Sequence, residues 1–167
     1  MRILGIDPGL TMTGYGLIDV GERQDIRLIE TGVIQPKRQA ELPDRLATVY
    51  RNLDAIIIQH NPRVMVLEKL YAHYKHPSTA FIIGHVRGVI CLACASRGLA
   101  LVEHSVKRIR KALIGQGNAT KEQTRVAVSQ MLKISAEKLP LDASDALALA
   151  IGYARMEAFQ FASVSRV

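Results

Sequence analysis

The order of its strand-like and helix-like segments is what most constrains the fold of this chain. Three segments with strand patterning follow one another at residues 2–7, 13–20 and 26–34, separated by short turns. Two more, 64–70 and 100–103, each follow a helix-like segment. Consecutive strands joined by turns pair antiparallel, whereas strands joined through a helix run parallel. The sequence therefore predicts an α/β fold with a mixed sheet flanked by helices.

Helical periodicity marks residues 42–60, 78–97, 107–114, 121–133 and 142–159. In the first of these segments Leu46, Val49 and Leu53 share one face, and Asn61-Pro62 ends it. The chain contains no internal repeat and no linker-like tract. Residues 1–167 are therefore predicted to form a single domain, long enough for a sizeable core.

Four acidic residues stand where the predicted elements end or begin. Asp7 and Glu68 each close an apolar run, and Asp142 and Asp145 lie three apart at the start of the last helix. Right-handed crossovers bring the ends of the first and fourth strands together if those strands are neighbours. Carboxylates gathered there repel one another unless a divalent cation lies among their oxygens. The set therefore predicts a two-cation site suited to phosphodiester hydrolysis.

Each acid also has an ordinary structural interpretation. Asp7 precedes Pro8-Gly9, a common turn sequence, and Glu68 can pair with Lys69 or another nearby base. Asp142 can cap the last helix, with Asp145 completing a capping-box-like pair. The combination favours the cation site more than any single member does.

The chain around these acids is basic. Lys and Arg outnumber Asp and Glu by 22 to 15, which gives a net charge of +7 and predicts a polyanionic partner, nucleic acid before a membrane. The densest basic segment holds Lys107, Arg108, Arg110 and Lys111, and Gly115-Gln116-Gly117 and Lys121 follow it. A solvated helix face has the same pattern, but the glycine turn favours an element that tracks phosphates.

The apolar helix at 78–97 is expected to be buried, with Cys91 and Cys94 packed as small hydrophobic residues, since a zinc site would need two further ligands. Arg87 and Arg97 interrupt the apolar stretch too closely to frame a membrane span. The N-terminus enters a strand without a charged leader. These features predict a soluble, cytoplasmic protein with no membrane partner.

Several motifs resemble those of the RuvC family of bacterial Holliday-junction resolvases, in the family's order and over most of the chain. They are Gly5-Ile6-Asp7-Pro8-Gly9-Leu10, Thr13-Gly14-Tyr15-Gly16, Leu67-Glu68, Arg87-Gly88, Gly115-Gln116-Gly117-Asn118-Ala119-Thr120-Lys121-Glu122-Gln123 and Asp142-Ala143-Ser144-Asp145-Ala146-Leu147-Ala148. The resemblance implies an RNase H-like fold, a five-stranded mixed sheet in the order 3-2-1-4-5. It also implies Mg²⁺-dependent, symmetric nicking of four-way DNA junctions by a homodimer, leaving 5′-phosphate and 3′-hydroxyl ends.

By position, the family's catalytic metal-binding acids fall on Asp7, Glu68, Asp142 and Asp145. The resemblance implies two Mg²⁺ ions per site, with Mn²⁺ as a substitute. Lys121 is expected in the catalytic set and, with Arg110, would stabilise charge near the scissile phosphate. Arg87 is expected among the DNA contacts, and a branch-migration helicase complex is a candidate partner.

The loop after Glu68 interleaves aromatic and basic residues. Tyr71 and Tyr74 are suited to stacking on unpaired bases at a junction centre, with Lys75 beside them for DNA contact. A surface loop whose tyrosines pack on the core has the same pattern. His73 and His76 suit surface or phosphate contacts better than metal binding.

Gly84 and Gly88 lie one helical turn apart and permit close helix approach. Packing against the sheet is the ordinary interpretation, but the resemblance favours a dimer contact between helices. A two-fold dimer would present one site to each of two opposed strands of a junction.

The chain departs from the family pattern at three places. Lys69-Leu70-Tyr71 replaces Gln-Val-Phe, Gly84-His85-Val86-Arg87-Gly88 replaces Gly-Gln-Ala-Arg-Gly, and Arg110 replaces a lysine. Two other functions remain open. One is an actin/sugar-kinase-like nucleotide-binding protein, which usually needs two such domains, and the other is a junction-binding protein without catalysis.

Overall fold

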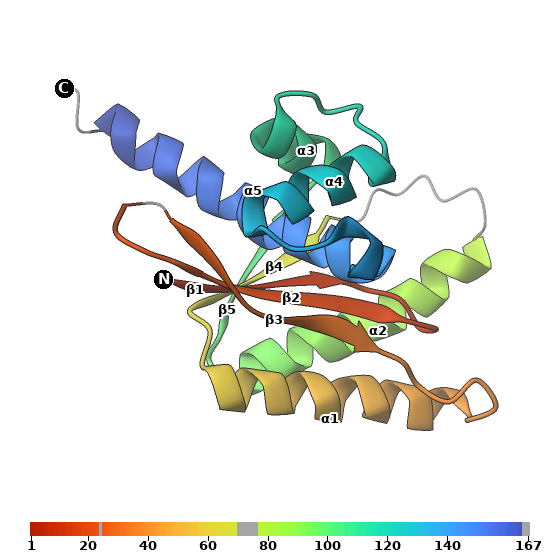
Figure 1. The fold of residues 1–167 in the computed structure, drawn as a ribbon. Helices are drawn as coiled ribbons and strands as arrows, with labels where there is room; N and C mark the ends of the chain where they lie inside the picture. Colours follow the sequence, from red (N-terminus) through yellow and green to blue (C-terminus); the bar gives the residue numbers. More distant parts are fainter. Residues whose placement is uncertain (24, 70–76, 165–167) are drawn as a thin grey trace.

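The computed structural model describes residues 1–23, 25–69 and 77–164, without the side chains of 77–79 and 159–164. Five strands form one sheet in the order β3-β2-β1-β4-β5 (Figure 1). The antiparallel strands are β1 (Arg2–Asp7), β2 (Thr13–Val20) and β3 (Ile26–Ile34). β4 (Val64–Glu68) runs parallel to β1, and β5 (Ala100–His104) runs parallel to β4. The predicted mixed sheet and its strand order are confirmed.

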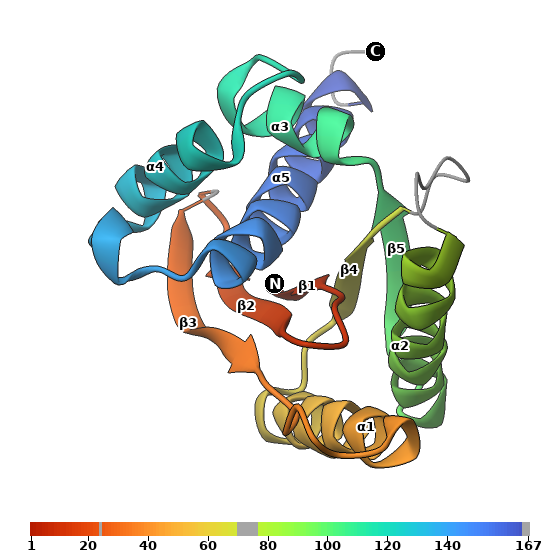
Figure 2. The same cartoon turned by 90° about the vertical axis from the view of Figure 1, so that its right-hand side faces the viewer.

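Helices cover both faces of the sheet and divide the core into two layers. On one face lie α1 (Leu42–His60) and α2 (Pro77–Ser96), and on the other lie α3 (Val106–Ile114), α4 (Lys121–Leu132) and α5 (Leu141–Val164), as Figure 2 shows. Successive side chains of a strand point to opposite faces, so Leu4 packs in the layer with α1 and α2 while Ile3 packs in the layer with α5. Coverage on both faces explains why β1 and β4 are apolar almost throughout.

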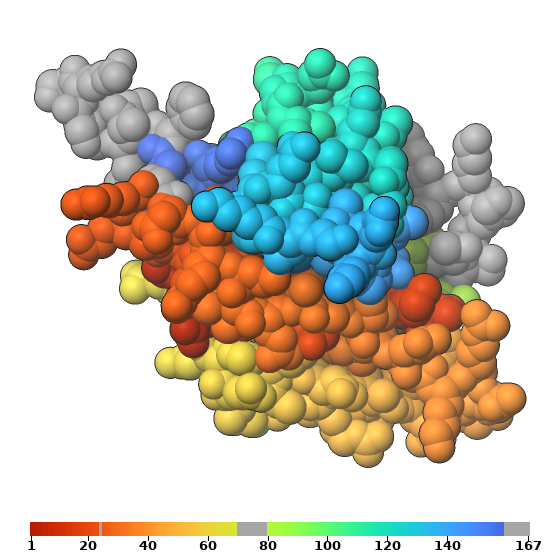
Figure 3. Space-filling view, in the orientation of Figure 1, coloured from red at the N-terminus to blue at the C-terminus, as the bar shows by residue number. Residues whose placement is uncertain are grey.

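The start of α5 lies very close to β1 and β2 because glycines face it. A Cβ atom on Gly5 would lie 2.0 Å from the carbonyl oxygen of Ala146, and one on Gly14 would lie 2.0 Å from that of Asp142. No side chain fits at either position without moving the helix backbone. These glycines therefore hold the first turns of α5 directly over the sheet, and α4 with the following connection lies against β3 beside it (Figure 3).

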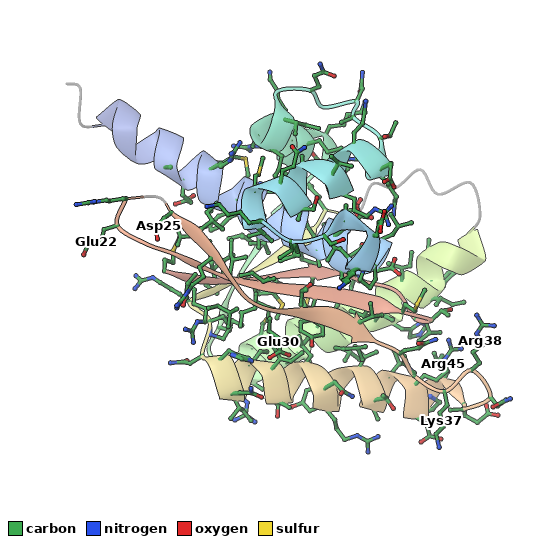
Figure 4. The ribbon with its side chains drawn as sticks, in the orientation of Figure 1. Glu22, Asp25, Glu30, Lys37, Arg38 and Arg45 are labelled. Carbon is green, nitrogen blue, oxygen red and sulfur yellow. The ribbon has the colours of Figure 1, made fainter. Side chains whose placement is uncertain are left out.

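The edge strand β3 is tied to β2 and to α1 through one carboxylate. Glu30 lies between the sheet and α1 (Figure 4), where Oε1 accepts a hydrogen bond from the Tyr15 hydroxyl at 2.8 Å and Oε2 lies 2.8 Å from Nε2 of His60. Burial, and then the hydrogen bond to Glu30, raise the pKa of Tyr15 to about 12. The Tyr15 hydroxyl therefore keeps its proton and remains a donor to Glu30.

Most element bounds agree with the predicted ones to within two residues. β4 ends at Glu68, whereas the prediction continued to residue 70, and α5 continues to Val164, past the predicted end at 159. A short 3-10 helix, Ala136–Lys138, was not predicted. In the part of the chain that is described, no helix is both long and apolar enough to cross a membrane.

Candidate active site

Asp7 ends β1 and is not needed to close the turn that follows. Its backbone still pairs with Gly14 of β2. The turn is closed by Thr13, whose fully buried hydroxyl donates to the carbonyl oxygen of Gly9 at 2.7 Å and accepts from its N–H at 3.3 Å. The side chain of Asp7 is therefore left for another role.

A cavity of about 270 Å³ brings together three of the four predicted acids, Asp7, Glu68 and Asp145. They come from the ends of β1 and β4 and the first turns of α5. The rest of the lining consists of Arg110, Lys121, Thr124, Val106, Ile109, Ala148 and Leu149. The convergence expected from the topology is therefore present for these three carboxylates.

The carboxylates in this cavity disfavour one another's charge. Burial, followed by the negative charges of Asp145 and Glu68, raises the pKa of Asp7 to about 7, while Lys121 acts in the opposite direction. The pKa of Glu68 is also raised, first by burial and then by Asp145. Glu68 has no ion pair with Lys69 or any other base in the described part of the chain. Such mutual perturbation in a cavity is typical of a functional cluster.

Lys121, which is expected in the catalytic set, supplies positive charge inside the acidic cluster. Its Nζ lies 2.6 Å from Oδ2 of Asp145. Burial alone would lower the pKa of Lys121, but the hydrogen bond to Asp145 and the charges of Asp145, Asp7 and Asp142 outweigh burial and raise it. The cluster thus holds one ammonium among its carboxylates.

The position of Lys121 follows from the way α4 begins. Thr120 accepts a hydrogen bond from the N–H of Gln123 at 3.1 Å, and the Gln123 side chain accepts from the N–H of Thr120 at 2.8 Å. This reciprocal capping box fixes the first turn of the helix, in which Lys121 is the first residue. Arg110 of α3 donates to the carbonyl oxygen of Ala119 at 2.7 Å and holds the preceding turn.

Asp142 lies outside the cavity lining. α5 begins at Leu141, so Asp142 lies within its first turn and is not the residue that precedes the helix as a cap. A negative charge there is favoured by the positive end of the helix. Its charge still contributes to raising the pKa of Asp7, so Asp142 acts on the cluster from its edge.

The ligand types fit a hard divalent cation. The three acids offer only oxygen, and none of the described residues that line the cavity is Cys or His. Burial, and then the charge of Asp145, raise the pKa values of Asp7 and Glu68, so both carboxylates would gain from a nearby positive charge. Among the described residues, no three Asp, Glu, His or Cys side chains lie close enough together to hold a metal ion. The neighbour of the Asp145 carboxylate in the structure is the ammonium of Lys121.

The basic segment of α3 divides into two groups. Arg110 faces the cavity, whereas Lys107, Arg108 and Lys111 are exposed. Ser105 caps the helix by accepting from the N–H of Arg108 at 3.2 Å, and Gly115 ends it in the left-handed region at φ 77°. An exposed basic surface therefore adjoins the acidic cavity.

Arg87, which the resemblance places among the DNA contacts, is buried on the inward side of α2. It is only 8% exposed, and its guanidinium donates to the backbone carbonyl of Glu68 and to the carboxylate of Glu103. Both contacts face the sheet, because Arg87 lies on the inward side of α2. The predicted contacts of Tyr71, Tyr74 and Lys75, and the roles of His73 and His76, lie outside the described residues.

The outward side of α2 is apolar and open. A Cβ atom on Gly84 or Gly88 would meet nothing within 4 Å, so packing against the sheet is not the reason for these glycines. They border a groove of about 710 Å³ between α1 and α2. The side chains of Phe81 and Leu92, which also line it, are 72% and 58% exposed.

The prediction that both cysteines of α2 are packed is confirmed for Cys94 and wrong for Cys91. Cys94 is buried, with its Sγ 3.3 Å from Sδ of Met65, but Cys91 is exposed. Cys91 lies three residues after Gly88, on the outward side of the helix. α2 therefore has two apolar sides, one packed against the sheet and one facing outward.

Two residues of the site were not predicted. Thr13 closes the turn after Asp7, and Thr124 is 1% exposed in the cavity wall, where its hydroxyl donates to the carbonyl oxygen of Thr120 at 2.8 Å. The spacing of Thr120 and Gln123 is a capping-box signal that would have fixed the start of α4. That start places Lys121 and, one turn later, Thr124.

Comparison with known proteins links this arrangement to one family. The family model for the crossover junction endodeoxyribonuclease RuvC matches residues 3–153. The RuvC protein of Rhodopirellula baltica is 41% identical over 149 residues, which cover 89% of this chain and 83% of the relative. That of Halorhodospira halophila is 39% identical over 153 residues, which cover 92% and 89%.

Solved structures share the fold at lower sequence identity. Thermus thermophilus RuvC in complex with a Holliday junction substrate has a TM-score of 0.86 at 22% identity, covering 95% of this chain and 96% of that one. The yeast mitochondrial Holliday junction resolvase has a TM-score of 0.71 at 14% identity, covering 93% and 78%.

Proposed function

Because the chain belongs to the RuvC family of crossover junction endodeoxyribonucleases, we propose that it nicks four-way DNA junctions by metal-dependent hydrolysis of phosphodiesters. It acts as a single RNase H-like domain with two symmetric nicks per junction, which leave 5′-phosphate and 3′-hydroxyl ends. The observation that carries the proposal is the cavity in which Asp7, Glu68 and Asp145 meet Lys121 and Arg110. Carboxylates and bases in one cavity are the groups that phosphodiester hydrolysis needs.

The carboxylates of Asp7, Glu68 and Asp145 are the residues that would hold divalent cations, and Asp142 would act from the edge of the site. We propose two Mg²⁺ ions per site, with Mn²⁺ as a substitute. When bound, such ions activate water and stabilise the leaving oxygen. Burial, and then the charges of Asp145 and Glu68, raise the pKa of Asp7, and the added positive charge of the ions would lower it.

The bases of the site act on the DNA phosphates. Lys121 and Arg110 lie in the same cavity as the acids, so their charges are positioned to stabilise negative charge on the scissile phosphate. Lys107, Arg108 and Lys111 are exposed on the adjacent surface of α3, where they would bind the phosphates that flank the cleavage point. The two bases in the cavity would therefore affect the rate of nicking, and the three exposed bases of α3 would affect the affinity for DNA.

A second copy of the chain would pair through the outward side of α2. Gly84 and Gly88 leave room for close approach of another helix, and Phe81 and Leu92 offer apolar surface beside them. A two-fold dimer of this kind supplies two sites for two opposed strands. We also propose that the protein works in the cytoplasm and that a branch-migration helicase complex is a further partner.

The test uses fixed and mobile synthetic four-way junctions with the full chain. Paired symmetric nicks in Mg²⁺ that disappear in EDTA and in Asp7→Asn are the expected result. Lys138→Gln is a matched control, because Lys138 is exposed in the 3-10 helix and does not line the cavity.

Two other results would contradict the proposal. Junction binding without nicking in Mg²⁺ would indicate a binding protein that lacks catalysis. ATP hydrolysis without junction binding would indicate a nucleotide-binding protein.

A further inference from the structure

Arg87 connects the outward-facing helix to the acidic cavity. It stands between Gly84 and Gly88 in sequence, but those glycines face outward and Arg87 faces the sheet, with a side chain only 10% exposed. Its guanidinium reaches the carboxyl ends of β4 and β5. An arginine buried at this depth needs partners for its charge and its N–H groups.

The partners of Arg87 are specific. One terminal nitrogen donates to the backbone carbonyl of Glu68, and the other pairs with the carboxylate of Glu103. The carbonyl of Glu68 belongs to the last residue of β4, one position past the last pair of the β1–β4 ladder, Ile6 with Leu67. Arg87 therefore supplies a donor where the ladder stops.

The backbone around Glu68 is fixed from a second side. The N–H of Lys69 donates to the carbonyl oxygen of His104 at 2.9 Å, and Glu68 pairs with His104 in the β4–β5 register. With Arg87 on its carbonyl, the peptide that follows Glu68 is held at both its oxygen and its nitrogen. The direction of the Glu68 side chain into the cavity depends on that peptide.

We infer that Arg87 is a positioning residue, which orients the carboxylate of Glu68 for cation binding and links it to α2. This inference rests on the proposed function, since it assumes that Glu68 binds a cation. Arg87 does not line the cavity and is almost fully buried, so it acts through Glu68 and Glu103. Residues that orient a metal ligand in this way affect metal affinity without contacting the metal.

The experiment compares Arg87→Met, Arg87→Lys and Glu103→Gln with the wild type. Mn²⁺ affinity is measured by isothermal titration calorimetry, and affinity for a fixed four-way junction is measured in EDTA. Thermal unfolding of each variant is recorded in parallel. Arg97→Met is the matched control, because Arg97 directly follows α2 and also pairs with a carboxylate, Asp54 at 2.6 Å, but lies away from the cavity.

Arg87→Met is expected to weaken Mn²⁺ binding by roughly 10-fold or more, with junction affinity in EDTA changed less than about twofold. Arg87→Lys keeps the charge and one donor, so it is expected to recover part of the Mn²⁺ affinity. Glu103→Gln keeps the hydrogen bond from Arg87 to Glu68 but removes the negative charge that pairs with Arg87. Its Mn²⁺ affinity is expected to lie between those of the wild type and Arg87→Met. Arg97→Met is expected to bind Mn²⁺ as the wild type does.

Wild-type Mn²⁺ affinity in Arg87→Met overturns the inference, and so does a loss of junction binding in EDTA with Mn²⁺ affinity intact. If Arg87→Met does not fold, wild-type Mn²⁺ affinity in both Arg87→Lys and Glu103→Gln overturns it. A wild-type protein that neither binds Mn²⁺ nor nicks junctions refutes the proposed function itself. If the wild type binds Mn²⁺ and nicks junctions, and the variants bind Mn²⁺ with the same affinity, only the role of Arg87 is refuted.

Discussion

The ammonium of Lys121 lies 2.6 Å from Oδ2 of Asp145, so the acidic cluster carries a positive charge of its own. The capping box of Thr120 and Gln123 fixes the start of α4 and with it the origin of this side chain. A divalent cation that binds Asp145 must share that carboxylate with the ammonium or displace it. This relationship makes cation binding and catalysis separable by mutation.

Replacing Lys121 by Gln is expected to tighten Mg²⁺ binding while slowing nicking. Removing a competing positive charge near the surface should improve affinity by about 1 kcal/mol, roughly fivefold, as measured by calorimetry. Losing the charge beside the scissile phosphate should lower the single-turnover nicking rate on the order of 100-fold. Weaker Mg²⁺ binding in Lys121→Gln, with Lys138→Gln unchanged, would show that Lys121 does not compete with the cation.

Asp7 is expected to make the metal-free protein less stable as the pH rises from about 4 to about 7. The pKa of its carboxyl is about 7 in the folded protein, against an ordinary value of 3.8 when the chain is unfolded. Between these values the folded chain keeps a proton that the unfolded chain has lost, so raising the pH favours unfolding. The contribution is fully present below pH 4 and is lost by about pH 7.

The measurement for Asp7 is urea unfolding in EDTA at about pH 4.5 and about pH 8, for the wild type and for Asp7→Asn. The Asn side chain resembles the protonated carboxyl, so the variant should lack this part of the pH dependence and should be the more stable protein at the higher pH. At the higher pH, Mg²⁺ should stabilise the wild type and so reduce the difference in free energy of unfolding between it and Asp7→Asn. A wild type that is more stable than Asp7→Asn at the higher pH in EDTA would contradict the raised pKa of Asp7.

Gly88→Leu is expected to weaken dimerisation without harming the fold of the monomer. A side chain at this position meets nothing within 4 Å in the monomer, and leucine favours a helix by about 0.5–1 kcal/mol over glycine. The added bulk would prevent close approach of a second α2. For the proposed dimer, sedimentation velocity should show Gly88→Leu as a monomer at concentrations at which the wild type sediments as a dimer. Ala55→Leu, on the exposed side of α1, should sediment as the wild type does.

Nicking reports on the same surface, because paired nicks require two sites. In Gly88→Leu the two nicks of one junction should become uncoupled, and intermediates with one nick should accumulate. Unchanged sedimentation and coupling would place the dimer contact elsewhere.

Lys111→Ala is expected to weaken junction binding through loss of one phosphate contact. Lys111 is exposed on α3 next to the cavity. Losing one such contact should reduce the slope of log K against log salt concentration by about 0.9. Fluorescence anisotropy in Ca²⁺ or EDTA measures this, and Arg51→Ala on α1, which lies on the other face of the sheet, is the control. Equal slopes for Lys111→Ala and the wild type would remove α3 from the DNA surface.

The fold was predictable because its signals are local. The apolar runs ending at Asp7 and Glu68 have strand length, and the turn residues between the first strands specify antiparallel pairing. The crossover rule then brings those two acids to one edge of the sheet. Gly5 and Gly14 complete the arrangement by letting α5 approach, which places Asp145 beside them.

What could not be predicted depends on which side of a helix faces the sheet. α2 is apolar on nearly all sides, so its periodicity does not distinguish the face of Arg87 from the face of Gly88. The prediction that Cys91 is packed is therefore wrong, since Cys91 is exposed, and the burial of Arg87 could not be predicted. The pairing of Lys121 with Asp145 joins residues 24 positions apart across two helices, and no local pattern specifies it.

The central claim is that Asp7, Glu68 and Asp145 form the cation site of a nuclease. Crystals soaked in Mn²⁺, with diffraction recorded at the manganese absorption edge, locate bound ions directly. We expect two anomalous peaks roughly 4 Å apart within ligand distance of these three carboxylates. Peaks only elsewhere, or no peak in this cavity at saturating Mn²⁺, would contradict the account.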